Sequence, residues 1–317
     1  MAIDRRILRV RLRDVFRAVA DLVLPRVCVV CGRRLILRED HICMCCEADL
    51  PQTWYWTLRY NPMSDRFNER IQRLLEQHDG AASASAGGAD TAATASEHPS
   101  ASAAGASDSA VYEPFSLAAA LFFYSGGYRN ITRALKYHRN FAAGAHFAHL
   151  LGRRLASSPI FGVPPVDLVV PVPLHWTRRW SRGYNQAEVI ARGVASELAV
   201  PACCRLLVRT RRTRSQTRLD ADSRAANVAS AFAVRPRALR LLARTFSLPA
   251  RSSGAPLSES STPAPTTAGA RRPLRHILLV DDVYTTGATL LACHRALRRT
   301  FGPGVVISIA TLAVAGR

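Results

Sequence analysis

Apolar residues along this chain follow two different spacings in turn, which predicts the order of its strands and helices. Continuous apolar runs rich in β-branched residues indicate buried strands, and one apolar face at helical spacing indicates a helix. The expected strands cover 118–124, 167–172, 205–208, 276–281 and 305–314, and the expected helices cover 128–137, 140–156, 186–198 and 287–299. Such alternation predicts an α/β fold with a doubly wound parallel sheet, whose ligands bind at the carboxyl ends of the strands.

Residues 1–25 carry an apolar stripe with arginines between its members, which predicts an amphipathic helix that ends before Pro25. The stripe consists of Ile3, Ile7, Leu8, Leu12, Val15, Phe16, Val19, Leu22 and Val23. A helix docked on its own domain explains this stripe, and a helix that contacts a partner or a membrane surface is the alternative.

Two stretches show no apolar periodicity. Residues 79–110 are nearly all Ala, Ser, Gly, Thr and Asp, and residues 247–272 are rich in Ser, Pro, Thr and Gly. Both compositions are typical of disordered segments. We therefore divide the chain into the helix 1–25, a cysteine module with its connection at 26–78, a linker at 79–110 and an α/β domain at 111–317, with a disordered insert at 247–272.

The chain is strongly basic, with a formal net charge of +20 over 317 residues. Such a charge attracts phosphate, nucleic acid or an anionic membrane surface. Lys136 is the single lysine, and the preference for arginine is typical of a GC-rich genome, although that bias does not explain the excess over acids. No apolar stretch is long enough to span a bilayer, and early acids interrupt any signal peptide. We expect a cytoplasmic protein without a transmembrane segment, for which peripheral membrane contact stays open.

Four of the eight cysteines form two Cys-x-x-Cys pairs. The pairs are Cys28 with Cys31 and Cys43 with Cys46. This pattern indicates a zinc site in a reducing compartment rather than a disulfide scaffold. Four thiolates close a tetrahedral site, so the zinc would be structural and would replace a core that this small module lacks. Cys45 and His41 are further candidate ligands, and four unrelated buried cysteines are the alternative to a metal site.

The segment HILLVDDVYTTGATL, from His276 to Leu290, leads from a buried strand into a helix. Unpaired N–H groups at a helix start bind phosphate, and Gly287 allows close approach of the backbone. Threonine hydroxyls add donors, and acids at the strand end accept hydrogen bonds from sugar hydroxyls. The predicted ribose-phosphate site consists of Asp281, Asp282, Thr285, Thr286, Gly287, Ala288 and Thr289. An acid pair that only ends a strand, with a threonine that only caps a helix, is the alternative.

The string from Leu279 to Thr289 resembles the phosphoribosyl pyrophosphate signature of type I phosphoribosyltransferases, and the chain as a whole resembles the ComF (competence protein F) family. The supporting segments are the two cysteine pairs, Tyr128 to Tyr137, Val170 to Leu174, Arg182 to Gln186, Gln216, and Arg224 to Asn227 before Phe232. The resemblance implies a type I phosphoribosyltransferase fold with a zinc module. It also implies that Asp281 and Asp282 contact the ribose hydroxyls and that Thr285–Thr289 wraps the 5-phosphate. Magnesium would be held chiefly by diphosphate and ribose oxygens of the ligand.

Further pocket residues follow by analogy with the type I enzymes. The diphosphate would lie near Pro173, at the end of a strand. A proline that only stiffens this strand end is the alternative. Arginine forks can clamp a diphosphate, and Asn or Gln can read a base or an amide, although a solvated basic face is the alternative. Lys136 either contacts phosphate or is an ordinary surface lysine. The predicted diphosphate or acceptor pocket contains Lys136, Pro173, Arg182, Tyr184, Asn185, Gln186, Gln216, Arg224 and Asn227. The basic run 209–214 resembles a loop that closes over substrate, or else contacts nucleic acid.

Three functions stay open at this point. The family resemblance implies a protein that assists DNA uptake in natural transformation, with single-stranded DNA and competence proteins as partners. The phosphate-binding segment also suits an active phosphoribosyltransferase, which would attach a base or an amine to ribose 5-phosphate with loss of pyrophosphate. A non-catalytic sensor of a sugar phosphate is the third.

Overall fold

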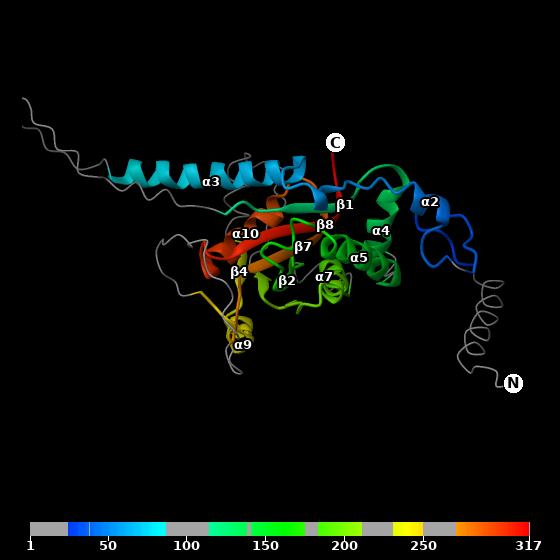
Figure 1. Ribbon diagram of the computed structural model, residues 1–317. Coiled ribbons are helices and arrows are strands. Elements are labelled where there is room, and N and C mark those ends of the chain that lie inside the picture. The colour runs from blue at the N-terminus through cyan, green and yellow to red at the C-terminus, as the bar shows by residue number, and fades with distance from the viewer. Residues whose placement is uncertain are drawn as a thin grey trace, which may run out of the picture.

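Four parallel strands form the central sheet, in the order β1-β8-β7-β2 (Figure 1). The computed structural model describes residues 25–37, 39–86, 114–137, 141–174, 183–210, 231–249 and 271–316. The sheet strands are β1 (Ala118–Phe123), β2 (Leu168–Pro171), β7 (His276–Tyr284) and β8 (Val306–Val314). In β7 the residues from Ile277 to Val280 are fully buried, as expected of a parallel strand covered on both faces.

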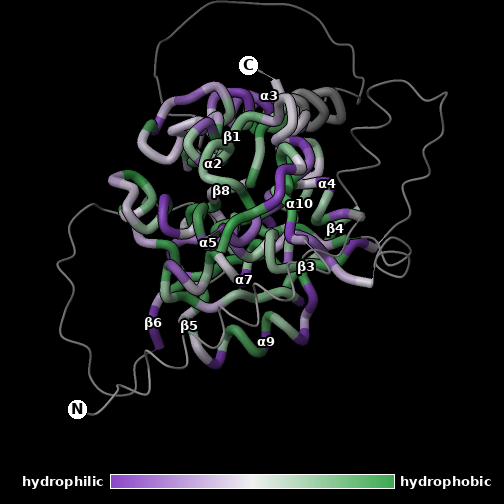
Figure 2. The backbone as a smooth tube through the Cα atoms, turned by 90° about the vertical axis from the view of Figure 1, so that its right-hand side faces the viewer, coloured by the Kyte–Doolittle hydropathy of each residue, from purple (hydrophilic) through white to green (hydrophobic). Residues whose placement is uncertain are grey.

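Helices cover both faces of this sheet, and alternate strand residues enter opposite cores. Leu278 and Val280 pack into one core, and Ile277 and Leu279 pack into the other. The first core is covered by α4 (Arg129–Tyr137), α5 (Phe141–Ala156) and α7 (Gln186–Glu197), and the second by α3 (Pro62–Ala86) and α10 (Ala288–Phe301). Hydrophobic colouring runs along the central strands in Figure 2. The predicted α/β class, a doubly wound parallel sheet with a four-cysteine module, is confirmed.

Shorter elements surround this centre. The antiparallel pair β3 (Leu207–Arg209) and β4 (Phe232–Val234) is followed by α9 (Pro236–Thr245), and β5 (Phe246–Ser247) pairs with β6 (Arg272–Pro273). The cysteine module contains α2 (Met44–Ala48), and two short turns are η1 (Tyr55–Thr57) and η2 (Gly126–Tyr128). Within the described ranges, no helix combines the length and the apolar character that a bilayer crossing requires.

The structure corrects the boundaries of both low-complexity segments. Residues 79–86 belong to α3 instead of the predicted linker 79–110. Met63, Phe67 and Ile71 anchor this helix at four-residue spacing. Alanine, which recurs over residues 81–86, has the highest helix propensity of any residue. At the ends of the predicted insert 247–272, Ser247 pairs with Pro273 and Phe246 pairs with Arg272. The rest of both segments, and residues 1–24, lie outside the described residues.

The chain leaves β2 and β7 toward opposite faces of the sheet. After β2 it forms α7 on one face, and Ala202 then pairs beside Val169 on the outer side of β2. After β7 it forms α10 on the other face and returns as β8. Ligands of parallel α/β sheets bind where neighbouring connections diverge in this way, because the strand ends there leave a crevice. The topology therefore directs attention to the carboxyl ends of β2 and β7.

Candidate functional site

A cavity of about 170 Å³ opens at the carboxyl ends of β2 and β7. It is walled by the residues after β2, the start of α7, the end of β3, the β7–α10 segment and one residue of α4. The wall residues are Lys136, Val172, Pro173, Leu174, Asn185, Gln186, Arg209, Asp281, Asp282 and Thr289. Seven residues that the sequence predicted for ribose, diphosphate or acceptor binding therefore meet around one space: Lys136, Pro173, Asn185, Gln186, Asp281, Asp282 and Thr289.

Two neighbouring acids dominate the electrostatics of this cavity. Asp281 and Asp282 lie within β7, which continues past its expected end to Tyr284. Lys136 Nζ lies 2.7 Å from Asp282 Oδ2, and the two side chains are only 26% and 14% exposed. Burial, followed by the charge of Asp282, raises the pKa of Asp281 to about 8, against the opposing effects of the Asp282 amide and of Lys136. At neutral pH the cavity thus presents one carboxylate paired with a cation and one mainly protonated carboxyl group.

The turn between β7 and α10 depends on a glycine. Gly287 has a φ of +74°, and a Cβ at this position would lie 2.8 Å from Cε2 and from the hydroxyl oxygen of Tyr284. Both observations mean that any other residue at position 287 would require a local rearrangement. Thr289 contributes to the cavity wall from the first turn of α10. The other predicted members of the turn lie outside the wall, namely Thr285, Thr286, Gly287 and Ala288. A phosphate held by this turn would therefore lie at the rim of the cavity.

The start of α7 is tied to the end of β2. Asn185 caps α7 by accepting from the Ala187 amide, and its Nδ2 donates to the Val172 carbonyl at 2.9 Å. Gln186 also lines the cavity and is 3% exposed, and its Nε2 is buried with no hydrogen-bond partner. A buried amide donor without an acceptor costs free energy. Gln186 is therefore placed to donate to an acceptor atom of a ligand.

Sequence reasoning missed Arg209 as a wall residue. The sequence places it at the start of the basic run 209–214, but in the structure it ends β3, and pairing of β3 with β4 brings it to the cavity. Val172 and Leu174, which form apolar wall, were likewise not assigned. Tyr184 is not part of the wall, and its ring packs 4.4 Å from the ring of Phe141. The remaining predicted residues lie outside the described residues, namely Arg182, Gln216, Arg224 and Asn227.

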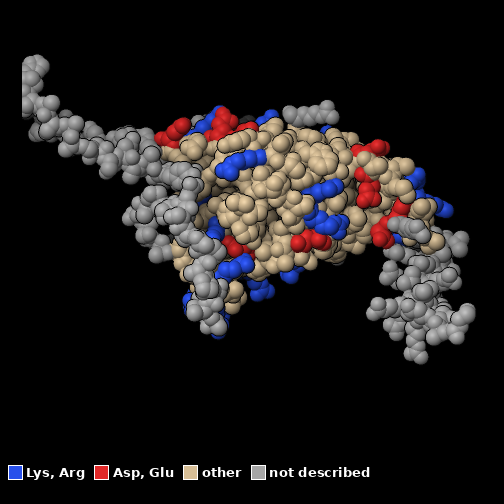
Figure 3. All heavy atoms as spheres, viewed as in Figure 1, with Lys and Arg blue, Asp and Glu red and all other residues tan. Residues whose placement is uncertain are grey.

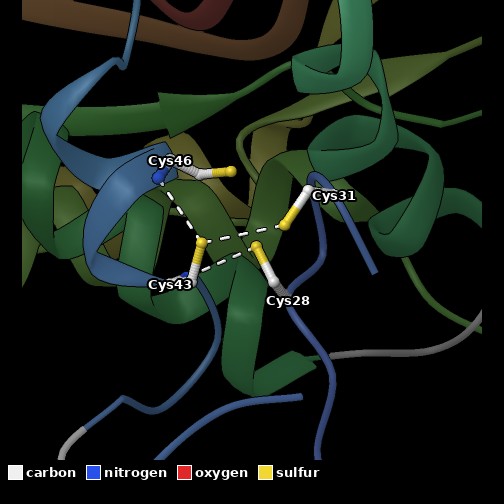
Figure 4. Close-up of side chains that lie close together, drawn as sticks. All are labelled: Cys28, Cys31, Cys43 and Cys46. Carbon is white, nitrogen blue, oxygen red and sulfur yellow. Dashed lines mark hydrogen bonds between the residues drawn. The ribbon is translucent and has the colours of Figure 1, made fainter. Parts of the chain in front are cut away.

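The four paired cysteines meet in one cluster (Figure 4). Their sulfur atoms all lie within 4.8 Å of one another, and those of Cys31 and Cys43 are 3.7 Å apart. Four thiolates around zinc define a tetrahedron with edges of ~3.8 Å. The Cys46 amide donates to Cys43 Sγ, which lowers the pKa of Cys43 to about 7, and the Cys43 amide donates to Cys28 Sγ. The donor set therefore fits a structural zinc ion.

Neither alternative ligand joins this cluster. Cys45 is exposed, and its sulfur lies 3.8 Å from an Arg33 nitrogen. The ring of His41 lies edge-on to the ring of His146, with centroids 5.8 Å apart. The geometry thus selects the two Cys-x-x-Cys pairs as the ligand set.

Comparison with known proteins identifies relatives with DNA-related names. The chain is 29% identical to Competence protein F of Haemophilus influenzae over 133 residues, which are 42% of this chain and 44% of that protein. It is 27% identical to DNA utilization protein YhgH of Salmonella typhi over 170 residues (53% of this chain, 60% of the relative), and 27% identical to YhgH of Escherichia coli K12 over 146 residues (46% and 49%). The chain spans about half the length of the relatives it matches. No family model matches it. These relatives confirm the resemblance to the ComF family.

The cysteine cluster predicts a selective loss of metal. Cys43→Ser should lower bound zinc from about one ion per chain to nearly none, because a closed structural site needs all four ligands. Cys45→Ser is the matched control and should keep its zinc. Elemental analysis of the purified proteins measures both, and equal zinc loss in the control would place Cys45 in the ligand set.

The raised pKa of Asp281 predicts a pH-dependent effect on stability. The folded protein binds this proton more tightly than the unfolded chain does, so the penalty for ionising Asp281 grows as pH rises from about 4 to about 8. Asp281→Asn removes this penalty and should raise the free energy of unfolding, relative to the wild type, by on the order of 2 kcal/mol more at pH 8.5 than at pH 4.5. Urea titrations at the two pH values measure the difference, with exposed Glu76→Gln as the control. An identical pH dependence in Asp281→Asn and the wild type would contradict this assignment.

Proposed function

We propose that this relative of competence protein F binds a ribose 5-phosphate ligand, such as phosphoribosyl pyrophosphate, in the cavity between β2 and β7. The observation that carries the proposal is the convergence of an acid pair, the start of α10 and the partnerless Gln186 amide on one cavity at the switch point of the sheet. Each of these groups is costly to bury or orient without a ligand, and together they complement a sugar that carries both hydroxyls and a phosphate.

The acid pair suits recognition of vicinal hydroxyls. Asp282, whose Oδ2 pairs with the Lys136 ammonium group, offers oxygen acceptors. Asp281, whose pKa is raised to about 8, can both accept and donate when it is protonated. The two side chains together can therefore bind a pair of hydroxyl groups, each of which donates and accepts. The phosphate would bind at the rim, against the N–H groups and hydroxyls of Thr285–Thr289.

The other half of the cavity suits a diphosphate. Lys136 and Arg209 bring positive charge to its wall, and Gln186 adds an amide donor near Pro173. Magnesium would enter with the ligand and be held mainly by ligand oxygens. The cavity wall offers no pair of carboxylates that is free to bind the ion. Asp282 is committed to Lys136, and Asp281 favours its protonated form. Two such groups do not form a metal cage, so diphosphate and ribose oxygens would supply most of the magnesium ligands.

Binding of the sugar phosphate would serve the uptake or use of DNA. The names of the relatives support this role, and so does the net charge of +20. On the face shown in Figure 3, basic side chains are interspersed with acidic ones, so that face shows no single large basic patch. Transfer of ribose 5-phosphate to a base or amine is the second candidate function, because the same cavity would hold the donor substrate of that reaction.

Calorimetry tests the binding proposal. The wild type should bind phosphoribosyl pyrophosphate with magnesium. The cavity variant, which combines Asp281→Asn with Asp282→Asn, should bind it more weakly by on the order of 100-fold, because two hydrogen-bonding acids are lost. A matched control changes two exposed acids of α3, Glu69→Gln with Glu76→Gln, and should bind as the wild type does.

The control titrations use ribose 5-phosphate and inorganic pyrophosphate separately. Equal affinity of the wild type and the cavity variant for phosphoribosyl pyrophosphate would exclude the cavity as its site. Release of pyrophosphate with a panel of bases and amines would establish the transferase, whereas binding without release leaves a binding protein.

A second measurement tests the link to DNA. Retention of single-stranded DNA by the wild type should fall steeply with salt, because binding of a polyanion releases counterions. The cavity variant should retain DNA equally in the absence of ligand, and only the wild type should respond to phosphoribosyl pyrophosphate. A wild-type protein that retains no single-stranded DNA at low salt would contradict direct DNA binding.

A further inference from the structure

The short helix α4 contacts the cysteine module at one end and the cavity at the other. It spans nine residues, Arg129–Tyr137, and follows directly on the turn η2. A helix of this length is roughly 13 Å long and moves as one rigid unit. Its residues Ile131 and Leu135 are buried. Leu135 packs directly against Gly144 of α5, because a Cβ at Gly144 would lie 2.1 Å from the leucine side chain.

Both cysteine pairs contact the start of this helix. The hydroxyl of Tyr128 donates to the carbonyl of Cys46, at 3.2 Å. Nδ2 of Asn130 donates to the carbonyl of Val30, which lies between Cys28 and Cys31, at 3.3 Å. The same Val30 carbonyl lies 3.0 Å from the position of a Cβ at Gly127, so the module and η2 are in close contact. One carbonyl from each metal-binding turn thus anchors the segment 127–130.

The far end of α4 reaches the acid pair. Lys136 is the residue of α4 in the cavity wall, and its ammonium group pairs with Asp282. The pair is largely buried, so its geometry matters more than that of an exposed ion pair. A displacement of the start of α4 would therefore change the position of the Lys136 ammonium group relative to Asp282.

We propose that the four-cysteine module positions Lys136 through Tyr128 and α4, so that the ligand affinity of the cavity depends on an intact metal site. The carbonyl positions of Val30 and Cys46 are set by the turns that the thiolates close. Apolar residues of the module, such as Leu35 and Ile42, are buried in the same core as α4, so the module and the helix also share apolar contacts. Tyr128 is a positioning residue in this arrangement, and Lys136 is the group that it positions. The effect on ligand affinity rests on the proposed function, whereas the effect on Lys136 does not.

The sole lysine of the chain provides a direct readout. The rate at which an amine-reactive acylating reagent labels Lys136, followed by peptide mass spectrometry, reports how well its ammonium group is held. Removal of zinc from the protein with a chelator should raise this rate by about 10-fold. Tyr128→Phe should raise it about threefold in the zinc-loaded protein, as expected for loss of one hydrogen bond. Tyr60→Phe, the same change at a tyrosine that is 68% exposed, should leave the rate unchanged.

Asn130→Ala is a second variant that breaks the other contact, and it should raise the labelling rate in the same direction. A labelling rate of Lys136 that stays constant through zinc removal and in both variants would overturn the proposal. The measurement needs no ligand, so it distinguishes failure of this coupling from failure of the proposed ribose-phosphate binding.

A double-mutant cycle then tests the effect on affinity. Tyr128→Phe should weaken binding of magnesium phosphoribosyl pyrophosphate by about 3- to 10-fold in calorimetry. The same change should have no further effect in a Lys136→Met background, because the positioned group is already absent. Additive losses would show that Tyr128 acts by another route and would overturn the proposed path.

Discussion

Two adjacent carboxyl groups, which directly follow the fully buried part of β7, are the constraint on which the rest of the site depends. Loss of hydration, followed by the charge of Asp282, raises the pKa of Asp281, and Lys136 pairs with Asp282. Such an arrangement is unfavourable for stability alone, because a buried ion pair seldom repays its desolvation. The proposed ligand, whose hydroxyl groups would complete the hydrogen bonding, accounts for its placement in a cavity wall.

The connections of the sheet explain why the cavity lies where it does. The strands β2 and β7 are neighbours, but α7 and α10 follow them on opposite faces, so the carboxyl ends of the two strands are left uncovered between the two connections. Asn185 then fixes the start of α7 against the end of β2, and Gly287 allows the tight turn into α10. Two helix starts and two strand ends therefore frame one small space, which Gln186 enters with an unsatisfied amide.

The cysteine module adds a second level of organisation. Four thiol groups bring two turns together, and carbonyl groups of those turns accept hydrogen bonds from η2 and α4. In this view zinc has a structural role that extends beyond its own module. It would stabilise the module, and through the proposed contacts the module would fix the start of a helix that borders the cavity.

The sequence by itself determined the features whose contacts are local. The cysteine pairs, the strand–turn–helix at 276–290 and the strand–helix alternation could be predicted, because each depends on residues within one turn, strand or helix. The pairing of Lys136 with Asp282 and the position of Arg209 in the cavity wall could not. The tertiary structure decided those contacts, along with the extension of β7 through its acids and of α3 into the alanine-rich segment. Such contacts depend on strand order and on the docking of distant helices, and local spacing carries no information about either.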